Sequence, residues 1–111
     1  MKIKQYDIWL ADLNPNIGTE PGKIRPVVVV QTDLLNGEHY STVICPISTN
    51  IIKGSDILRV HITKTQLNKP SDILVDQMRA IDNRRFIKPL GQLTNEQKNK
   101  LSENLKIILD L

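Results

Sequence analysis

The sequence has one cysteine, few aromatic residues and no long apolar run. Because Cys45 has no possible partner, an internal disulfide is excluded, and since no signal peptide is recognisable we expect a reducing cytoplasm. No apolar stretch approaches the ~20 residues that span a bilayer. Aromatic residues make up 4% of the chain, too few for a base-stacking platform. We therefore expect Trp9 and Phe86 in the core, and Cys45 as a buried small hydrophobe rather than a nucleophile.

Positive charge is only mildly in excess. The formal net charge is +3 at pH 7, and the basic residues are dispersed, with Arg84 and Arg85 as the only adjacent pair. This balance admits an anionic partner without requiring one. The length of 111 residues predicts a single domain, residues 1–111, and the 40% hydrophobic content suits an ordinary globular core.

Short apolar runs separated by proline, glycine and asparagine predict a chain rich in strands. The expected strands are 6–13, 27–31, 42–47, 57–62, 72–78 and 87–93. Four consecutive valines after Pro26 indicate a strand buried on both faces. Pro89 and Gly91 interrupt the last run, which predicts an edge strand. The loop 14–23 is longer than a tight hairpin needs, and such loops are often functional.

One helix is expected at the end of the chain, from Asn95 to about Leu109. Thr94 and Gln97 have the spacing of a capping box, and apolar residues recur at helical spacing at Leu101, Leu105 and Ile108. Residues 82–86 predict a further helical turn. Many short strands followed by one helix favour a β-rich α+β fold with a strongly bent sheet or small barrel. Periodicity does not give the strand order.

Four stretches stand out as a set. They are Asp7-Ile8-Trp9-Leu10-Ala11-Asp12-Leu13-Asn14-Pro15, Gly22-Lys23-Ile24-Arg25-Pro26-Val27-Val28-Val29-Val30-Gln31, Pro46-Ile47-Ser48-Thr49-Asn50, and Val75-Asp76-Gln77-Met78-Arg79-Ala80-Ile81-Asp82. In this order and spacing they resemble the MazF/PemK family of toxins from toxin–antitoxin pairs, over nearly the whole chain. The resemblance implies an SH3-like barrel (the MazF/Kid/CcdB-like toxin fold) of about six or seven short strands with a C-terminal helix.

The resemblance also implies a function and partners. It predicts a homodimer that cleaves single-stranded RNA, including mRNA, sequence-selectively, with no metal and no other cofactor. It predicts a cognate antitoxin of the MazE/PemI kind, whose extended acidic tail lies over the active groove. Operator DNA is expected as a partner only through the toxin–antitoxin complex.

Metal-free RNA cleavage uses the 2′-hydroxyl of the substrate as the nucleophile. The enzyme must accept its proton, stabilise the extra charge on phosphorus and protonate the departing 5′-oxygen. The expected products are a 2′,3′-cyclic phosphate and a 5′-hydroxyl end. DNA lacks the nucleophile and should survive.

Arg25 matches the catalytic arginine of the family, and its planar fork of donors suits two phosphate oxygens. Ser48 matches a position where many members carry a catalytic threonine, and Thr49 is the second candidate hydroxyl. Asp76 matches an aspartate proposed as general base in plasmid-borne relatives, but their arginine acid, two residues earlier, is Leu74 here. The acid is then Arg25, a water or nothing, and a guanidinium is a poor proton donor at neutral pH. Without the resemblance, a solvated strand-start residue is the favoured interpretation of Arg25, and a turn that ends a strand is the favoured interpretation of Ser48.

The remaining candidates concern RNA binding. Thr19, Glu20 and Lys23 lie in the loop 14–23 and are expected to border the groove, with Lys23 on phosphate. Gln77 is expected to contact a base edge or orient a neighbour, and Arg79 is a further candidate. A solvated loop is an equally good interpretation of Glu20 and Lys23, and a surface or hydrogen-bonded carboxylate is an equally good interpretation of Asp76.

Three other functions are alternatives to metal-free RNA cleavage by Arg25 and Ser48. His39 and His61 together would make an acid–base pair, but His61 lies within a predicted strand and His39 in a polar loop. A binding toxin of the same fold, like the gyrase poisons, would act through its C-terminus, and residues 107–111 lack the tryptophan expected there. A degenerate relative that binds RNA or antitoxin without cutting would not need Arg25 and a hydroxyl at position 48.

Overall fold

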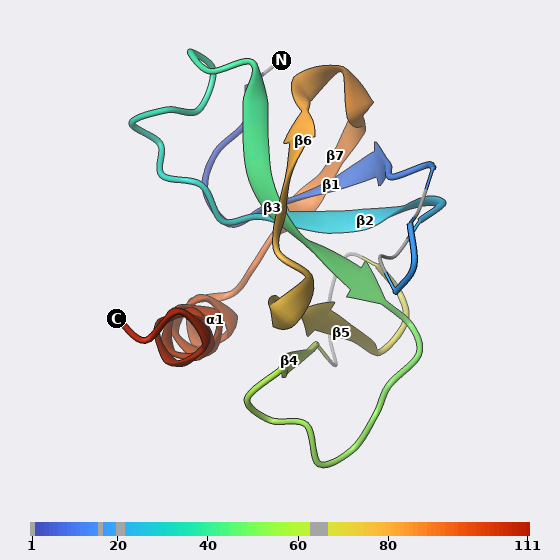
Figure 1. Ribbon diagram of the computed structural model, residues 1–111, viewed down its shortest axis with the longest axis vertical. Helices are drawn as coiled ribbons and strands as arrows, with labels where there is room; N and C mark the ends of the chain where they lie inside the picture. The colour runs from blue at the N-terminus through green and yellow to red at the C-terminus, as the bar shows by residue number, and fades with distance from the viewer. Residues whose placement is uncertain (1, 16, 20–21, 63–66) are drawn as a thin grey trace.

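A bent antiparallel sheet and one long helix form the fold (Figure 1). The computed structural model describes residues 2–15, 17–19, 22–62 and 67–111. Within them the elements are β1 (Asp7–Asp12), β2 (Ile24–Val29), β3 (Ser41–Ser48), β4 (Arg59–Ile62), β5 (Ser71–Leu74), the 3-10 helix η1 (Val75–Gln77), β6 (Arg79–Asp82), the 3-10 helix η2 (Asn83–Arg85), β7 (Phe86–Gln92) and α1 (Asn95–Leu109). The predicted β-rich α+β class is confirmed.

The strand order is β4-β5-β3-β2-β1-β7, and β6 pairs with β3 off this path. The long strand β3 therefore belongs to both halves of the sheet: its first part pairs with β6 through Ser41–Ile44, and its end pairs with β5 through Ile47 and Ser48. β7 lies at one end of the order, as its proline and glycine predict.

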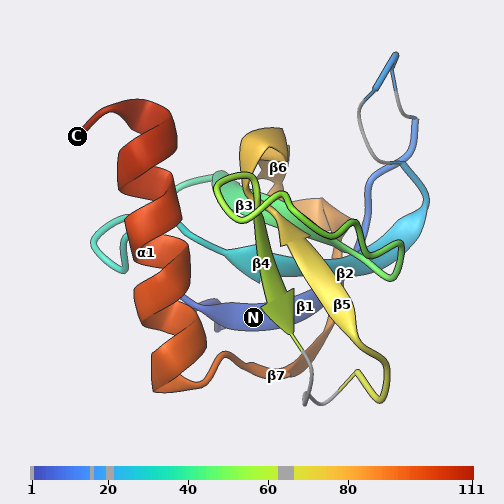
Figure 2. The same cartoon turned by 90° about the horizontal axis from the view of Figure 1, so that it is seen from below.

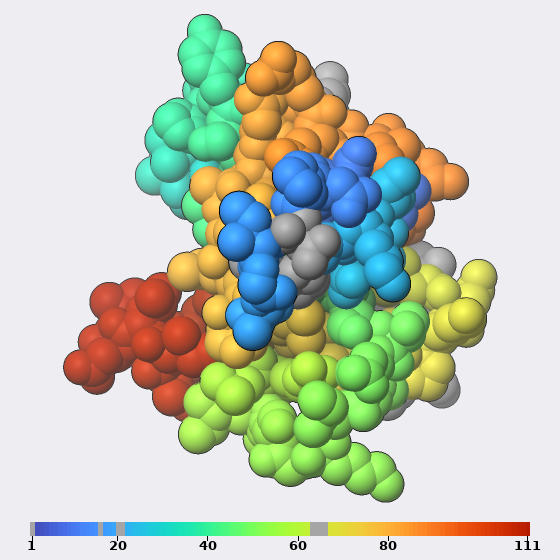
Figure 3. Space-filling view, turned by 45° about the vertical axis from the view of Figure 1, so that its right-hand side comes forward, coloured from blue at the N-terminus to red at the C-terminus, as the bar shows by residue number. Residues whose placement is uncertain are grey.

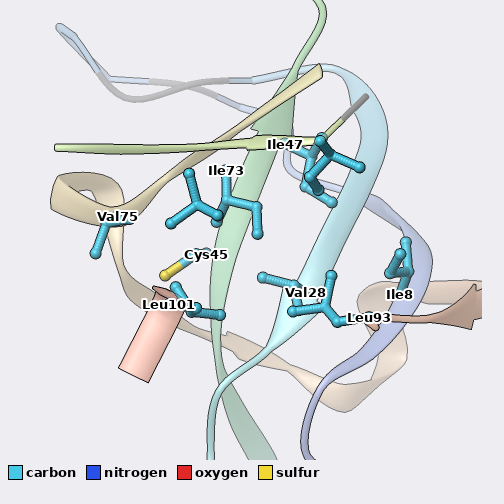
Figure 4. Close-up of a cluster of buried hydrophobic side chains, with 10 residues drawn as sticks. Ile8, Val28, Cys45, Ile47, Ile73, Val75, Leu93 and Leu101 are labelled. Atoms are coloured by element: carbon cyan, nitrogen blue, oxygen red, sulfur yellow. The ribbon is translucent and has the colours of Figure 1, made fainter. Parts of the chain in front are cut away.

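Two hydrophobic clusters lie on opposite faces of β2. Val28 packs with Ile8, Cys45, Ile73 and Leu101 in one of them (Figure 4). Val27 and Val29 pack with Trp9, Ala11, Ile44 and Phe86 in the other. Because successive side chains of a strand point to opposite faces, a strand between two cores must be apolar at every position. The valine run is thereby explained, and its predicted burial on both faces is confirmed.

All six predicted strands have different bounds in the structure, and those of β1 and β3 differ by one residue at each end. β2 begins at Ile24, because this residue and Arg25 pair with Asp12 and Ala11 of β1. β4 begins at Arg59, so 57–58 lie outside it. β7 begins one residue before the predicted 87–93, and ends one residue earlier.

The prediction of one strand over 72–78 was wrong. That strand ends at Leu74, and η1 follows. Since β5 and β6 both pair with β3, at different places along it, the chain must step along β3 between them, and η1 makes this step. β6 itself was not predicted.

Helix α1 stands at one side of the sheet (Figure 2) and packs against β4 and η1. Its bounds and capping box are as predicted: the Thr94 hydroxyl accepts from Gln97 N, and the Gln97 side chain accepts from Thr94 N. Leu101 is fully buried in the core. The buried Asn104 amide donates to the Asp56 carbonyl at 2.8 Å, which ties the helix to the segment before β4. Among the described residues no helix is long and apolar enough to cross a membrane.

Candidate active site

A row of polar side chains crosses the sheet where β2 begins and β3 ends. Continuing the β2–β3 register two residues beyond the Val27–Pro46 pair brings Arg25 opposite Ser48. Ser48 is paired with Asp72 of β5, and Asp72 with His61 of β4. Residues directly opposite each other in an antiparallel sheet share a face. The row Arg25–Ser48–Asp72–His61 therefore lies on one face.

Arg25 is half-buried at the base of the β1–β2 loop. Its Nε donates to the Gly22 carbonyl at 2.8 Å, which fixes the plane of the guanidinium. Neither Nη has a partner among the described residues, so both can donate to an anion. A fixed, half-desolvated guanidinium with two free donors is well suited to a phosphate.

The two candidate hydroxyls differ in placement. Ser48 is half-buried on the face of Arg25, and its Oγ accepts from Asn50 N at 3.0 Å. Accepting this bond leaves its O–H free to donate. Thr49 is the next residue, beyond the end of β3, and it is exposed. The geometry favours Ser48 as the partner of Arg25.

The β1–β2 loop is pinned at its base and projects away from the sheet (Figure 2). Leu13 N donates to Lys23 O at 2.8 Å, and Lys23 N donates to Asn14 Oδ1 at 2.7 Å. Figure 3 looks onto this loop, drawn blue to cyan, with the green segment after β3 below it. Thr19 and Lys23 are exposed. Glu20 lies outside the described residues.

The other candidates lie along the chain after β5. Asp76 is exposed in η1, and its charge helps raise the pKa of Cys45, which points to the opposite face of β3 from Ser48. Because η1 follows the end of β5, Asp76 is not among the strand residues that are paired in the polar row. Gln77 is half-buried in η1, and Arg79 is half-buried in β6, opposite Ile44. Leu74 is buried in β5.

Two residues of the site region were missed by sequence reasoning. Arg85 donates from Nη1 to the carbonyls of Asp12, at 3.0 Å, and Asn14, and so holds the loop base from η2. Asp72 is a fully buried carboxylate within the row. Its signal in the sequence was a charge in an apolar run, Ser71-Asp72-Ile73-Leu74-Val75, since a buried carboxylate requires partners.

The alternative chemistries find no support in the geometry. His39 precedes the start of β3, whereas His61 pairs beside its end, so the eight residues of β3 separate them. Burial, with the charge of Asp76, raises the pKa of the Cys45 thiol to about 12, which makes it unreactive as expected. No group of three His, Cys, Asp or Glu among the described residues is arranged to hold a metal ion.

The bent sheet with one C-terminal helix is the fold of solved MazF toxins. MazF from Deinococcus radiodurans superposes with a TM-score of 0.86 at 21% identity, covering 100% of this chain and 99% of that one. An endoribonuclease from a mycobacterial species, solved in complex with its cognate antitoxin, gives 0.81 at 16% identity, covering 98% and 96%. These likenesses establish the class of fold.

Sequence comparison establishes the family. A family model described as PemK-like, MazF-like toxin of type II toxin-antitoxin system matches residues 4–109. Endoribonuclease EndoA of Bacillus subtilis is 34% identical over 113 residues, covering 100% of this chain and 97% of that protein. The chain belongs to the PemK/MazF family of toxins from type II toxin–antitoxin systems, as the four sequence stretches predicted.

Proposed function

We propose that this toxin is a metal-independent endoribonuclease that cleaves single-stranded mRNA sequence-selectively through attack of the 2′-hydroxyl. The main support is the β2–β3 register: continued two residues past the Val27–Pro46 pair, it sets Arg25 across from Ser48 on one face of the sheet, beside the projecting loop. Family membership and the 34% identical endoribonuclease support it. The products are a 2′,3′-cyclic phosphate and a 5′-hydroxyl end.

Arg25 supplies the main chemical contribution. Its two free Nη groups donate to the non-bridging phosphate oxygens, whose charge grows as the 2′-oxygen attacks. The Gly22 bond holds the guanidinium in place before substrate arrives, so little reorganisation is needed during reaction. The Ser48 hydroxyl donates a hydrogen bond to the same phosphoryl group, and the Thr49 hydroxyl is the alternative donor.

The general base is proposed to be Asp76, which is exposed and able to accept a proton. η1 follows β5 and is not part of the polar row. To act as the base, the Asp76 carboxylate must therefore reach a 2′-hydroxyl that is bound over the row. The 5′-oxygen is protonated by water, since a guanidinium holds its proton too tightly.

RNA approaches along the face bordered by the loop. Lys23 lies exposed two residues before Arg25 and contacts a neighbouring phosphate. Thr19 and Glu20 contact bases from the same loop, and Gln77 and Arg79 do so from η1 and β6.

The proposed partners follow from the family. A MazE/PemI-like antitoxin with an acidic tail would compete for the basic groove, and operator DNA would be bound only through that complex. A homodimer would cover exposed apolar side chains, which include Ile17, Leu34, Tyr40, Ile107 and Leu111. The free, buried Cys45 is consistent with the reducing cytoplasm proposed as its location.

The test uses a long transcript and a DNA of the same sequence, incubated with purified protein in excess chelator. The RNA should be cut at a few sites, with 2′,3′-cyclic phosphate ends, and the DNA should remain intact. Arg25→Ala, purified identically, should cut at least about a hundredfold more slowly, which excludes a contaminating ribonuclease. Cleavage that requires a divalent metal would overturn the mechanism. Intact RNA across several transcripts would favour a binding toxin or a degenerate relative.

A further inference from the structure

The polar row continues beyond Ser48 into a buried network that the proposed chemistry does not use. Asp72 is 0% exposed, and both of its oxygens are occupied. Oδ1 accepts from His61 Nδ1 at 2.5 Å, and Oδ2 accepts from Arg59 Nη1 at 3.1 Å. Buried ion pairs of this kind contribute little net stability, because desolvation offsets their attraction. The buried pair of Asp72 with Arg59 is better explained by a role in positioning neighbouring residues.

The network binds the backbone of the segment that follows Ser48. Arg59 Nη1 also donates to the Asn50 carbonyl at 2.7 Å, and the Ile52 amide donates to Asp72 Oδ2 at 3.3 Å. Asn50 N in turn donates to the Ser48 hydroxyl oxygen. A chain of bonds therefore runs from Asp72 and Arg59 through Asn50 to the Ser48 hydroxyl.

This segment would otherwise be poorly held. Residues 49–54 are exposed, and the side chains of Ile51 and Ile52 are 41% and 45% accessible. The bonds to Asn50 and Ile52 come from Arg59 of β4 and Asp72 of β5. β4 is anchored to α1 because the Asn104 amide donates to the Arg59 carbonyl at 3.4 Å, and β5 pairs with β4. The rigid half of the sheet thus fixes the loop on which the candidate hydroxyl depends.

The charge balance of the network also fits a site for RNA. A lone carboxylate next to Ser48 would repel the phosphate, but Arg59, only 16% exposed, neutralises it at 3.1 Å. On the other side of Asp72 lies His61, whose Nε2 is 3.9 Å from Asp56 Oδ1. The row next to Arg25 therefore presents no uncompensated negative charge to the substrate.

From these contacts we infer that Arg59, Asp72 and His61 are positioning residues, which hold the Ser48–Ile52 segment so that the Ser48 hydroxyl faces the scissile phosphate. This inference rests on the proposed function. Arg59 and Asp72 act through Ser48 and touch neither RNA nor the reacting atoms. Losing them should therefore slow the chemical step and leave RNA affinity nearly unchanged.

The test replaces the ion pair by apolar residues of similar volume, Arg59→Met with Asp72→Leu, which avoids leaving a buried charge unpaired. The substrate is a labelled single-stranded RNA containing a mapped cut site, in excess chelator. The single-turnover rate should fall tenfold to a hundredfold, on the order seen for supporting-shell residues. RNA affinity is measured with the same oligonucleotide carrying a 2′-deoxy nucleotide at the cut site, which cannot be cleaved. Its affinity should change less than about threefold, because these residues affect the chemical step and not RNA binding.

Two further measurements identify positioning as the cause. Amide hydrogen exchange of Asn50 and Ile52 should accelerate, while that of Val28 in β2 should not. Arg59→Lys, which keeps a charge and a donor beside Asp72, should retain much of the rate that the double variant loses. Asp82→Asn is the matched control: it breaks the exposed 3.0 Å pair with Arg84, away from the row, and should change neither rate nor exchange.

The outcomes separate the two hypotheses. If the wild-type protein cuts RNA and the double variant cuts equally fast despite faster exchange at Asn50, the positioning role is wrong and the proposed function stands. If rate, affinity and thermal stability fall together, the network is merely structural and the inference is again overturned. If the wild-type protein cuts no RNA, the proposed function fails and the inference fails with it.

Discussion

The charge of Arg25 is expected to supply most of the transition-state stabilisation, and its size can be worked from the structure. A phosphoryl oxygen bound by the free Nη groups lies roughly 4 Å from the centre of the positive charge, where a unit charge pair is worth about 4 kcal/mol at an effective dielectric constant of ~20. This energy corresponds to roughly a thousandfold in rate. Because Arg25 is only half-buried, solvent screens part of it, and Arg25→Ala should lose about a hundredfold to a thousandfold.

Arg25→Lys separates charge from geometry. Lysine keeps the positive charge but loses the planar fork and the Nε bond to the Gly22 carbonyl, which measures 2.8 Å. A charge-assisted hydrogen bond contributes roughly 1.5–3 kcal/mol, so this variant should lose about tenfold to a hundredfold. It should therefore remain faster than Arg25→Ala.

The assay is single-turnover cleavage of a labelled RNA in excess chelator, with circular dichroism to verify the fold. Equal losses in the lysine and alanine variants would contradict the electrostatic account and assign the effect to shape. An alanine variant within about threefold of wild type, a loss below ~1 kcal/mol, would refute the proposed site.

Three other predictions concern the hydroxyls, the core and the buried thiol. Ser48→Ala should slow cleavage about tenfold to a hundredfold, because a hydrogen bond to a charged group contributes roughly 1.5–3 kcal/mol. Thr49→Ala, exposed and outside β3, should stay close to wild type in the same assay, and the reverse order would exchange their roles. Leu101→Ala should lower the free energy of unfolding by about 3 kcal/mol and Tm by roughly 10 °C in a thermal melt, because the side chain is fully buried. A Tm shift below ~2 °C would show that the helix does not pack on the sheet as described. The pKa of Cys45 rises from 9.0 to about 12 on folding, so the native state keeps the proton that the unfolded chain releases. Its stabilising effect is full below pH ~9 and declines as the pH rises toward 12. Cys45→Ala should remove this part of the pH dependence of urea unfolding, and an unchanged slope would contradict the burial of the thiol.

Local signals in the sequence determined much of the fold. The Thr94–Gln97 capping box and the Leu101 stripe fixed the helix bounds, because capping and periodicity act within a few residues. The valine run fixed a strand with cores on both sides. The family motifs, as patterns of residue identity, indicated Arg25 and Ser48 before any contact was known.

Tertiary pairing alone decided the rest. η1 replaces the end of the expected fifth strand because β5 and β6 meet β3 at different places, and no short window of sequence contains that information. The alignment of Arg25, Ser48, Asp72 and His61 in one row depends on the register of four strands far apart in the chain. The ion pair of Asp72 with Arg59 could be recognised only once β4 and β5 were paired, since ion pairing between strands is set by their register.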